Sequence, residues 1–276
     1  MIGDLDISGV FLPTLLVLMG ITYLVYLPAG YQRGAGLGRR FGVLYLLHAP
    51  PGRPDGYFLA GAIGVQADIL IAHHRIPPLL IIAPYAKTSR YDDDTEWANA
   101  GAGRYEDLVL EVVHDADRRF VTAADRRHRA LAGLSEGGFG ALNVALHHLE
   151  IFSGVQSWSG YFTATASDAF KAASPATLRA NSPSKYVPDL APAIHRLGLR
   201  AWLYQGRSDD MPPVRLQQFA HELADAGANV TYAFFPGGHD WGLWRRQTRR
   251  MLTTVGAWFR RSTSAETSHL TEIGAP

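Results

Sequence analysis

A serine with glycines on both sides lies between an apolar run and a helical pattern. Ser135 follows Gly133 and precedes Gly137 in a Gly-x-Ser-x-Gly stretch. A serine on a sharp strand-to-helix turn needs small residues at these two places, because the backbone there is strained and tightly packed. The chain has 28 glycines, so the motif alone could match by chance. Its significance depends on an acid and a histidine following at later strand ends.

Such partners do follow, in the required order. Asp209 and Asp210 come after one predicted buried strand, and His239 comes after the next. A serine hydroxyl is a weak nucleophile near neutral pH unless a neutral imidazole takes its proton, and the imidazole needs a carboxylate to fix its tautomer. We therefore predict the serine as nucleophile, His239 as general base, and Asp209 or Asp210 as the acid. Taken singly, Asp209 could cap a helix and His239 could be one of eleven ordinary histidines.

This chemistry also needs donors for the negative charge that develops on the reacting carbonyl oxygen. Two backbone N–H groups usually supply them, each contributing about 3 kcal/mol. The N–H of Glu136, at the start of the helix after the serine, is one candidate. The loop at residues 48–52 should provide the other, because it follows a buried strand at the same edge of the sheet.

Continuous apolar runs alternate with helical patterns along the chain. Runs that are apolar at every position are typical of parallel strands buried on both faces. The alternation predicts an α/β fold, with a mostly parallel central sheet and helices on both faces. The order of serine, acid and histidine at its strand ends is the α/β-hydrolase order, so an α/β-hydrolase fold is expected. The predicted strands are 41–47, 79–83, 129–134, 154–159, 199–205 and 230–235. The predicted helices are 60–73, 105–120, 138–148, 216–226 and 243–260.

These elements predict one α/β domain over residues 21–261. Residues 162–197 have weak periodicity and no clear strand, so we expect a cap-like excursion from the sheet there. Residues 262–276 are polar and are expected to form a flexible tail.

The N-terminal residues 1–20 belong to an apolar segment with two interpretations. Residues 10–27 contain no charged side chain and approach the ~18 apolar residues of a membrane span. A membrane-associated helix over residues 8–26 would give membrane contact, whereas two buried strands separated near Gly20 would extend the sheet. β-Branched and aromatic residues at 21–27 favour strands, and with them a cytoplasmic protein over a membrane-associated one.

Composition excludes several classes of function. A net charge of +1 with no clustered basic stripe argues against nucleic acid as a partner. The absence of cysteine excludes disulfides, thiolate metal sites and a cysteine nucleophile. Three adjacent carboxylates at 92–94, with Glu96, are expected to be a solvated loop, because adjacent residues rarely converge on one ion. No metal site is predicted.

The motifs together resemble the esterase family of α/β-hydrolases that includes S-formylglutathione hydrolases, feruloyl esterases and mycolyltransferases. The resemblance covers residues 21–259 and implies Ser135 as nucleophile, His239 as base and Asp209 as acid, with Asp210 as alternative. The stretches that carry it are Val25 to Tyr31, Val43 to His48, Ala132 to Gly138, Ser159 to Tyr161, Gly206 with Asp209, and Phe235 to Trp241 ending in Trp244 and Arg245.

One departure from the family pattern affects the oxyanion site. Ala49 replaces the usual glycine, and Pro50 stands where the second donor is expected. Proline has no N–H. Either Gly52 donates instead, or the site lacks one donor.

We therefore expect a serine carboxylesterase that acts on a small-molecule ester through an acyl-enzyme, without metal or organic cofactor. Pro50, Trp158, Tyr161 and Trp241 are expected around the substrate pocket, although core packing would explain the aromatic residues equally well. Two alternatives remain: an acyltransferase of the mycolyltransferase type, and a catalytically inactive hydrolase fold that serves as a binding module.

Overall fold

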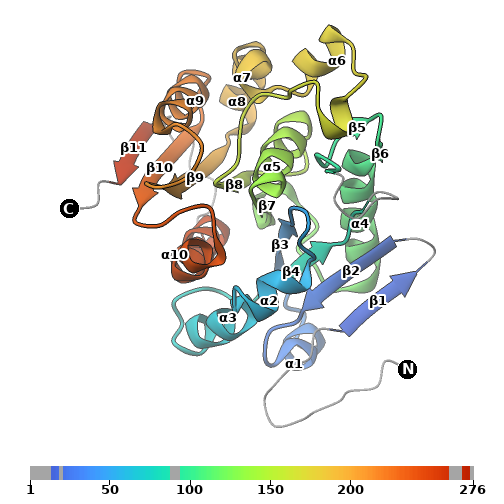
Figure 1. Cartoon of the computed structure of the whole chain (residues 1–276). Coiled ribbons are helices and arrows are strands. Elements are labelled where there is room, and N and C mark those ends of the chain that lie inside the picture. The colour runs from blue at the N-terminus through green and yellow to red at the C-terminus, as the bar shows by residue number, and fades with distance from the viewer. Residues whose placement is uncertain (1–13, 19–20, 88–93, 261–268, 274–276) are drawn as a thin grey trace.

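The computed structural model describes residues 14–18, 21–87, 94–260 and 269–273. Its centre is a nine-stranded sheet with the order β1-β2-β4-β3-β7-β8-β9-β10-β11 (Figure 1). The strands of this sheet are β1 (Thr14–Leu18), β2 (Ile21–Tyr26), β3 (Gly42–Leu47), β4 (Leu79–Pro84), β7 (Arg129–Leu134), β8 (Gly154–Trp158), β9 (Arg200–Gly206), β10 (Asn229–Phe235) and β11 (His269–Ile273). A separate hairpin pairs β5 (Asn99–Ala100) with β6 (Gly103–Arg104).

Helices connect the strands and cover both faces of the sheet. The α-helices are α1 (Tyr31–Gly36), α2 (Asp55–Leu59), α3 (Ile63–Ala72), α4 (Tyr105–Arg119), α5 (Glu136–His147), α6 (Pro175–Ala180), α7 (Pro183–Tyr186), α8 (Ala191–Leu197), α9 (Pro213–Asp225) and α10 (Trp241–Arg260). Short 3₁₀ turns are η1 (Arg126–His128), η2 (Asp168–Phe170) and η3 (Val187–Leu190). The predicted α/β-hydrolase architecture is confirmed.

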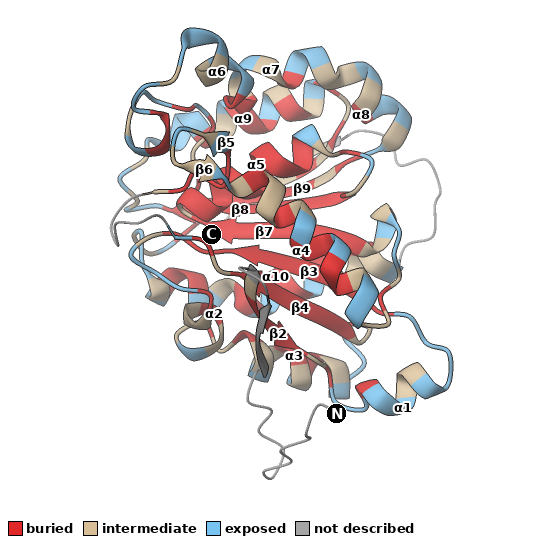
Figure 2. Ribbon diagram, turned by 90° about the vertical axis from the view of Figure 1, so that its right-hand side faces the viewer, coloured by how far each residue is buried: buried red, intermediate tan, exposed pale blue. Residues whose placement is uncertain are grey.

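In the order of the large sheet, the seven strands β4-β3-β7-β8-β9-β10-β11 run parallel to one another. β1 and β2 extend this sheet in antiparallel fashion beyond β4. Every residue of β3, β4 and β7 is buried, as Figure 2 shows by the red centre of the sheet. This explains the continuous apolar runs in the sequence, because both faces of these strands pack against helices.

Two hydrophobic layers lie on the two sides of the sheet. On one side the strands pack against α4, α5 and α9, through side chains such as Val112 and Phe219. On the other side they pack against α3 and α10, through side chains such as Leu70 and Met251. Successive residues of β7 alternate between these layers, as the two-residue repeat of a strand requires.

The apolar N-terminal segment forms strands in its described part. β1 and β2 pair antiparallel, and β2 pairs with β4, so the segment extends one edge of the sheet. This confirms the strand interpretation for residues 14–18 and 21–26 and contradicts a helix over them. Residues 8–13 and 19–20 lie outside the described residues. Within the described residues no helix is long and apolar enough to cross a membrane.

The prediction of a flexible tail is wrong for residues 269–273. They form β11, which pairs parallel with β10. The Tyr232 hydroxyl donates a 2.8 Å hydrogen bond to Glu272, so a cross-strand polar contact supports this edge. The apolar pattern of these five residues is too short to reveal an edge strand after a polar stretch. The rest of the predicted tail lies outside the described residues.

Residues 162–197 contain helices and turns but no strand, as expected. α7 packs against α5, and η3 packs against α9, so the segment covers the α5 side of the sheet. Stacked Phe162 and Phe219 rings, 4.3 Å apart, fix its first residues against α9. Its role as a cap over the site stays a prediction.

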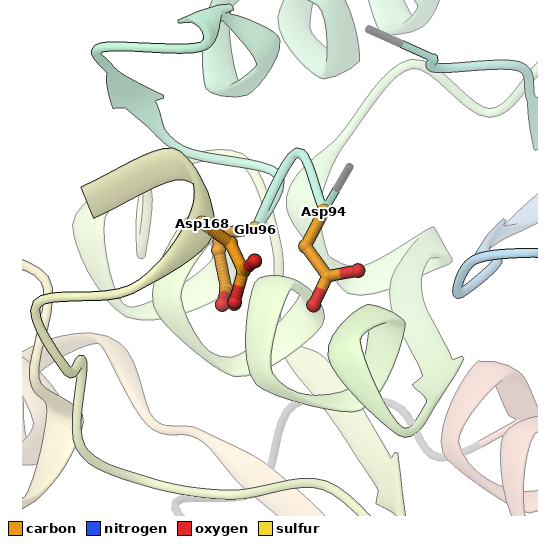
Figure 3. Close-up of side chains that lie close together, drawn as sticks. All are labelled: Asp94, Glu96 and Asp168. Carbon is orange, nitrogen blue, oxygen red and sulfur yellow. The ribbon is translucent and has the colours of Figure 1, made fainter. Parts of the chain in front are cut away.

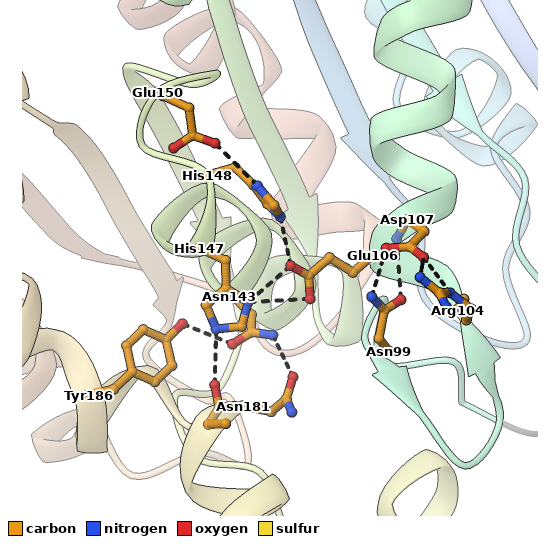
Figure 4. Close-up of polar contacts among 11 residues, drawn as sticks. Asn99, Arg104, Glu106, Asp107, Asn143, His147, His148, Glu150, Asn181 and Tyr186 are labelled. Carbon is orange, nitrogen blue, oxygen red and sulfur yellow. Dashed lines mark hydrogen bonds and ion pairs between the residues drawn. The ribbon is translucent and has the colours of Figure 1, made fainter.

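A buried polar network joins α4, the end of α5 and the excursion (Figure 4). Glu106 lies 3.1 Å from His147 Nδ1 and 2.7 Å from His148 Nε2, while His147 Nε2 contacts the Ala180 carbonyl at 3.0 Å. His148 Nδ1 also lies 3.4 Å from Glu150. Since both ring nitrogens of His148 face carboxylates, the ring is held best as imidazolium.

The network shifts two pKa values in opposite directions. Burial alone would raise the pKa of Glu106, but the hydrogen bonds from both histidines outweigh it and lower the pKa to about 2. The hydrogen bond to Glu106 raises the pKa of His148 above its ordinary 6.5, against the effect of burial. Glu106 and His148 are therefore both charged across mildly acidic pH.

Glu106→Gln should destabilise the fold most between about pH 4.5 and pH 6.5. Because the pKa of Glu106 is lowered by folding, its carboxylate stabilises the folded state at pH values above its unfolded pKa, near 4.5. Because the pKa of His148 is raised by folding, its imidazolium stabilises the folded state fully at pH values below its unfolded pKa, near 6.5. We expect Glu106→Gln to lower the free energy of unfolding by about 2 kcal/mol at pH 5.5. This difference should become smaller as the pH rises through the folded pKa of His148. Urea unfolding at pH 5.5 and pH 8.5 measures it.

Glu111→Gln is the matched control, because Glu111 is exposed on the same helix. A loss for Glu106→Gln no larger than that for Glu111→Gln, or equal at both pH values, would contradict this account.

Candidate active site

Ser135 occupies the turn between β7 and α5 with φ of 54° and ψ of −123°. This conformation is strained for any residue but glycine. The Ser135 N–H donates a 2.8 Å hydrogen bond to the Trp158 carbonyl of the neighbouring strand. A Cβ on Gly133 would lie 2.1 Å from the Gly137 carbonyl oxygen, and a Cβ on Gly137 1.9 Å from that of Leu47. The two glycines thus let the strained turn pack directly on the end of β3.

The loops after β9 and β10 bring Asp209 and His239 together. His239 Nδ1 lies 3.2 Å from each carboxylate oxygen of Asp209. The Asp209 side chain is 1% exposed and that of His239 is 33% exposed. Asp210 is exposed. Of the two acids left open from the residues alone, Asp209 is the one that contacts His239.

Backbone hydrogen bonds hold these two loops in register. The Arg207 N–H donates to the Phe235 carbonyl at 2.8 Å, and the Ser208 N–H donates to the Gly237 carbonyl at 3.0 Å. A Cβ on Gly206 would lie 2.2 Å from the Gly237 carbonyl oxygen. The position of Asp209 relative to His239 is therefore set by main-chain contacts between strand ends.

Ser159, at the end of β8, supports the same pair. Its hydroxyl is hydrogen-bonded to Asp209 and accepts a 3.3 Å hydrogen bond from Trp244 Nε1. The Trp244 ring lies edge-on to His239, with centroids 5.2 Å apart. Ser159 also has a positive φ, of 51°, so its backbone is strained like that of Ser135. It follows β8, the strand that pairs with β7.

Charge and hydrogen bonding shift both pKa values of the pair. The hydrogen bond to Asp209 raises the pKa of His239, against the effect of burial, and nearby Asp210 and Asp240 add to the rise. Burial would raise the pKa of Asp209, but hydrogen bonds from His239 and Ser159 outweigh it and lower the pKa. The pair is therefore arranged to stabilise an imidazolium beside a carboxylate.

The predicted oxyanion residues lie on both sides of one small hollow. Glu136 is the first residue of α5, where backbone N–H groups have no partner within the helix. His48, Pro50, Gly52 and Glu136 all line the hollow, and Gly52 is exposed. The structure thus brings the two candidate donor segments to one place.

The predicted donor is the backbone N–H of Glu136, whereas its side chain is buried inside the protein. It is 3% exposed and accepts hydrogen bonds from the Thr95 N–H at 3.0 Å and the Thr95 hydroxyl at 2.7 Å. Burial raises its pKa well above the ordinary value. Nearby, Trp97 Nε1 donates to the His48 carbonyl at 2.8 Å. The segment at 95–97 therefore connects the start of α5 to the loop after β3.

The predicted pocket aromatics do not gather around one cavity. Trp158 is 2% exposed and stacks on Tyr204 within the core, so it is a packing residue. Trp241 is partly exposed and packs edge-on against Tyr57. Tyr161 stacks on Phe139 and donates a hydrogen bond to Glu96. Of the four residues predicted at the pocket, Pro50 alone lines the hollow beside Glu136.

Three carboxylates lie close together (Figure 3), and one of them, Glu96, accepts the hydrogen bond from Tyr161. Oxygens of Asp94, Glu96 and Asp168 all lie within 4.8 Å of one another. Burial raises the pKa of Glu96 to about 7, despite the hydrogen bond from Tyr161. Asp168 comes from the excursion, so this convergence could not be read from the acidic run at 92–94, of which 92 and 93 lie outside the described residues. The predicted absence of a metal is not tested by this arrangement.

Sequence reasoning missed the supporting roles of Ser159, Trp244 and Thr95. Ser159 and Trp244 lay within stretches that carried the family resemblance, and a hydroxyl at the end of a parallel strand is a signal for a site at that edge. Thr95 had no such signal, because its contact with Glu136 spans 41 positions of sequence.

Asp209→Asn should lower the pKa of His239 toward or below 6.5, because it removes the charge that raises it. Asp210→Asn should cause a smaller fall, since Asp210 acts only through space. Titration of the imidazole ring by NMR measures this, with the His239 resonance assigned by its loss in His239→Gln. A larger fall in Asp210→Asn than in Asp209→Asn would mean that Asp210 is the true partner.

Comparison with known proteins gives one family and one fold. The model of the family described as Putative esterase matches residues 19–255. The endo-1,4-beta-xylanase/feruloyl esterase of Xylanibacter ruminicola is 33% identical over 133 residues, which is 46% of this chain and 18% of that protein. The chain spans about half or less of the length of the curated relatives it matches.

Solved structures agree on the fold. A ferulic acid esterase superposes with a TM-score of 0.75 at 24% identity, covering 86% of this chain and 92% of that one. An S-formylglutathione hydrolase from Staphylococcus aureus superposes with a TM-score of 0.68 at 19% identity, covering 85% and 92%. The fold, the matched family model and the arrangement of strand-end residues agree, and the chain belongs to the esterase family of α/β-hydrolases.

Proposed function

We propose that this protein is a serine carboxylesterase that hydrolyses small-molecule carboxylic esters through an acyl-enzyme on Ser135. The observation that carries the proposal is the Asp209–His239 pair at the same sheet edge as the strained Ser135 turn. Membership of the esterase family supports ester hydrolysis as the reaction class. No relative's substrate is assigned to this chain.

In the proposed mechanism, neutral His239 takes the proton of the Ser135 hydroxyl as the oxygen attacks the ester carbonyl. Asp209 holds the ring by accepting the Nδ1–H, so that Nε2 is free to act as base. The tetrahedral intermediate collapses with loss of the alcohol, which receives the proton from the imidazolium. Water, activated by His239 in turn, then releases the acid.

The negative oxygen of the intermediate requires backbone donors. We assign the Glu136 N–H as the first and the Gly52 N–H as the second, since Pro50 has none. Gly52 lines the same hollow as Glu136, and a Cβ there would lie 2.5 Å from the Ala49 carbonyl oxygen. The tight Ala49–Gly52 turn therefore depends on a glycine at this place.

Ser135→Ala should abolish turnover of short 4-nitrophenyl esters to below about 10⁻³ of wild type, because the nucleophile is lost. Ser184→Ala, which removes a hydroxyl bonded to Thr163 in the excursion, should retain activity and serves as control. A fluorophosphonate probe should label wild type at Ser135 and leave Ser135→Ala unlabelled. Folded wild-type protein that neither turns over any ester nor reacts with the probe would indicate an inactive binding module.

The rate should rise with pH to a plateau, with a midpoint above 6.5. His239 must be neutral to act as base, and its pKa is raised by Asp209, so protonation inactivates the enzyme as pH falls through that value. The pH dependence of kcat/KM on a neutral ester measures it. A midpoint well below 6.5 would exclude His239 as the base in the contact described.

Hydrolysis and acyl transfer share the acyl-enzyme and differ in what resolves it. Product ratios with and without an added alcohol distinguish them. Hydrolysis predicts free acid as the main product at modest alcohol concentrations, whereas a dominant transfer product would assign the protein to the acyltransferases.

A further inference from the structure

An exposed apolar strip lies on α2 and α3. Leu59, Val65 and Ile69 are 76%, 59% and 39% exposed. They make up three of the five large hydrophobic side chains that are exposed among the described residues. Val65 and Ile69 are four positions apart and share one face of α3.

Four exposed arginines lie beside this strip on α10: Arg245, Arg246, Arg249 and Arg250. α3 and α10 are packed against each other. One open groove is lined by Ala62 and Gln66 of α3 together with Arg245, Arg246 and Arg249 of α10. Val65 and Ile69 each follow a groove residue, Ala62 and Gln66, by three positions, and residues three apart on a helix are neighbours on its surface, so the apolar strip adjoins the arginine row.

The charge of this surface is strongly one-sided. Arg246 donates to the Pro236 carbonyl and Arg250 lies over the Phe235 ring, so both contact neutral groups. Two acids of the neighbouring segments have partners of their own, since Asp240 accepts a hydrogen bond at the start of α10 and Asp68 accepts one from Tyr26. The surface therefore offers cations and apolar side chains with little local compensation.

We propose that this α3–α10 surface docks the protein on bilayers that contain anionic phospholipid. Arginines beside exposed aliphatic side chains match an interface in which headgroup phosphates lie next to acyl chains. A nucleic acid would satisfy the arginines and leave the aliphatic residues exposed. A second copy of this chain would bring two arginine rows together, which charge repulsion opposes.

The docking places the catalytic edge next to the bilayer, because α10 begins two residues after His239. The surface is independent of the chemistry proposed for Ser135. Binding can therefore be measured without any ester, and its failure would leave hydrolysis of soluble esters untouched.

The experiment is co-flotation of the full chain with vesicles of neutral phosphatidylcholine, or of phosphatidylcholine with 30% phosphatidylglycerol. Binding is expected to the anionic vesicles only, falling as salt rises from 50 to 500 mM. Arg245→Gln/Arg249→Gln should weaken it about tenfold, because each arginine near an anionic surface contributes appreciably. Val65→Ser/Ile69→Ser should weaken it severalfold at unchanged charge.

Matched controls come from the opposite face of the sheet. Arg196→Gln/Arg215→Gln on α8 and α9 makes the same charge change, and Val214→Ser removes an aliphatic side chain that is 50% exposed. Both should bind anionic vesicles as wild type does. All variants should hydrolyse a soluble ester at the wild-type rate, which shows that they are folded.

Four results would overturn the proposal. Equal binding to both vesicle types, or none to anionic vesicles at 50 mM salt, excludes docking of this kind. Loss in the arginine variant with no effect of Val65→Ser/Ile69→Ser would indicate general anion binding. A concentration-dependent dimer in sedimentation that Val65→Ser/Ile69→Ser abolishes would make the strip a contact between copies of this chain.

Discussion

The contact between the Ser135 turn and the end of β3 is the constraint on which the site depends. Gly133 and Gly137 bring the backbone of the turn against the Leu47 carbonyl, at a separation that no Cβ would permit. This contact places the start of α5 beside the loop that follows β3. The strained φ of Ser135 persists because β7, β8 and α5 fix the residues on both sides of it. Packing of main chain on main chain thus determines where the candidate nucleophile lies.

Much of the fold could be predicted from the sequence because the central strands are buried on both faces. Continuous runs such as Phe41 to Leu47 identify such strands, and their order along the chain fixes which ends meet at one edge. The same logic places Ser135, Asp209 or Asp210, and His239 at strand ends from the sequence alone. The end of a strand can be predicted where the strand is buried on both faces, because burial favours an apolar residue at every position and the apolar run stops where the strand ends.

The parts that sequence reasoning missed depend on contacts between distant residues. β11 is a five-residue edge strand in which Thr271 and Glu272 are exposed, so its composition resembles a polar tail. Asp168 of the excursion lies beside Glu96, and Thr95, in the segment between β4 and β5, lies beside Glu136, so both contacts join residues far apart in the sequence. Trp158 was expected at the pocket and instead lies in the core, because the alternation of β8 points its side chain to the α10 side of the sheet. No local pattern carries such information.

The positions of the site residues along the chain also determine when, during synthesis, the candidate site can be complete. Its three strand-end residues are drawn from β7, β9 and β10, and the pair of Asp209 and His239 depends on backbone bonds between the last two of these. During synthesis from the N-terminus, a chain that has emerged only as far as α7 already holds the Ser135 turn but neither of its partners. The apolar face that α10 later covers is then open to solvent. Ser135 therefore has no base until β9 and β10 have been made, and apolar surface that α10 covers in the complete fold is a hazard for aggregation until that helix is in place.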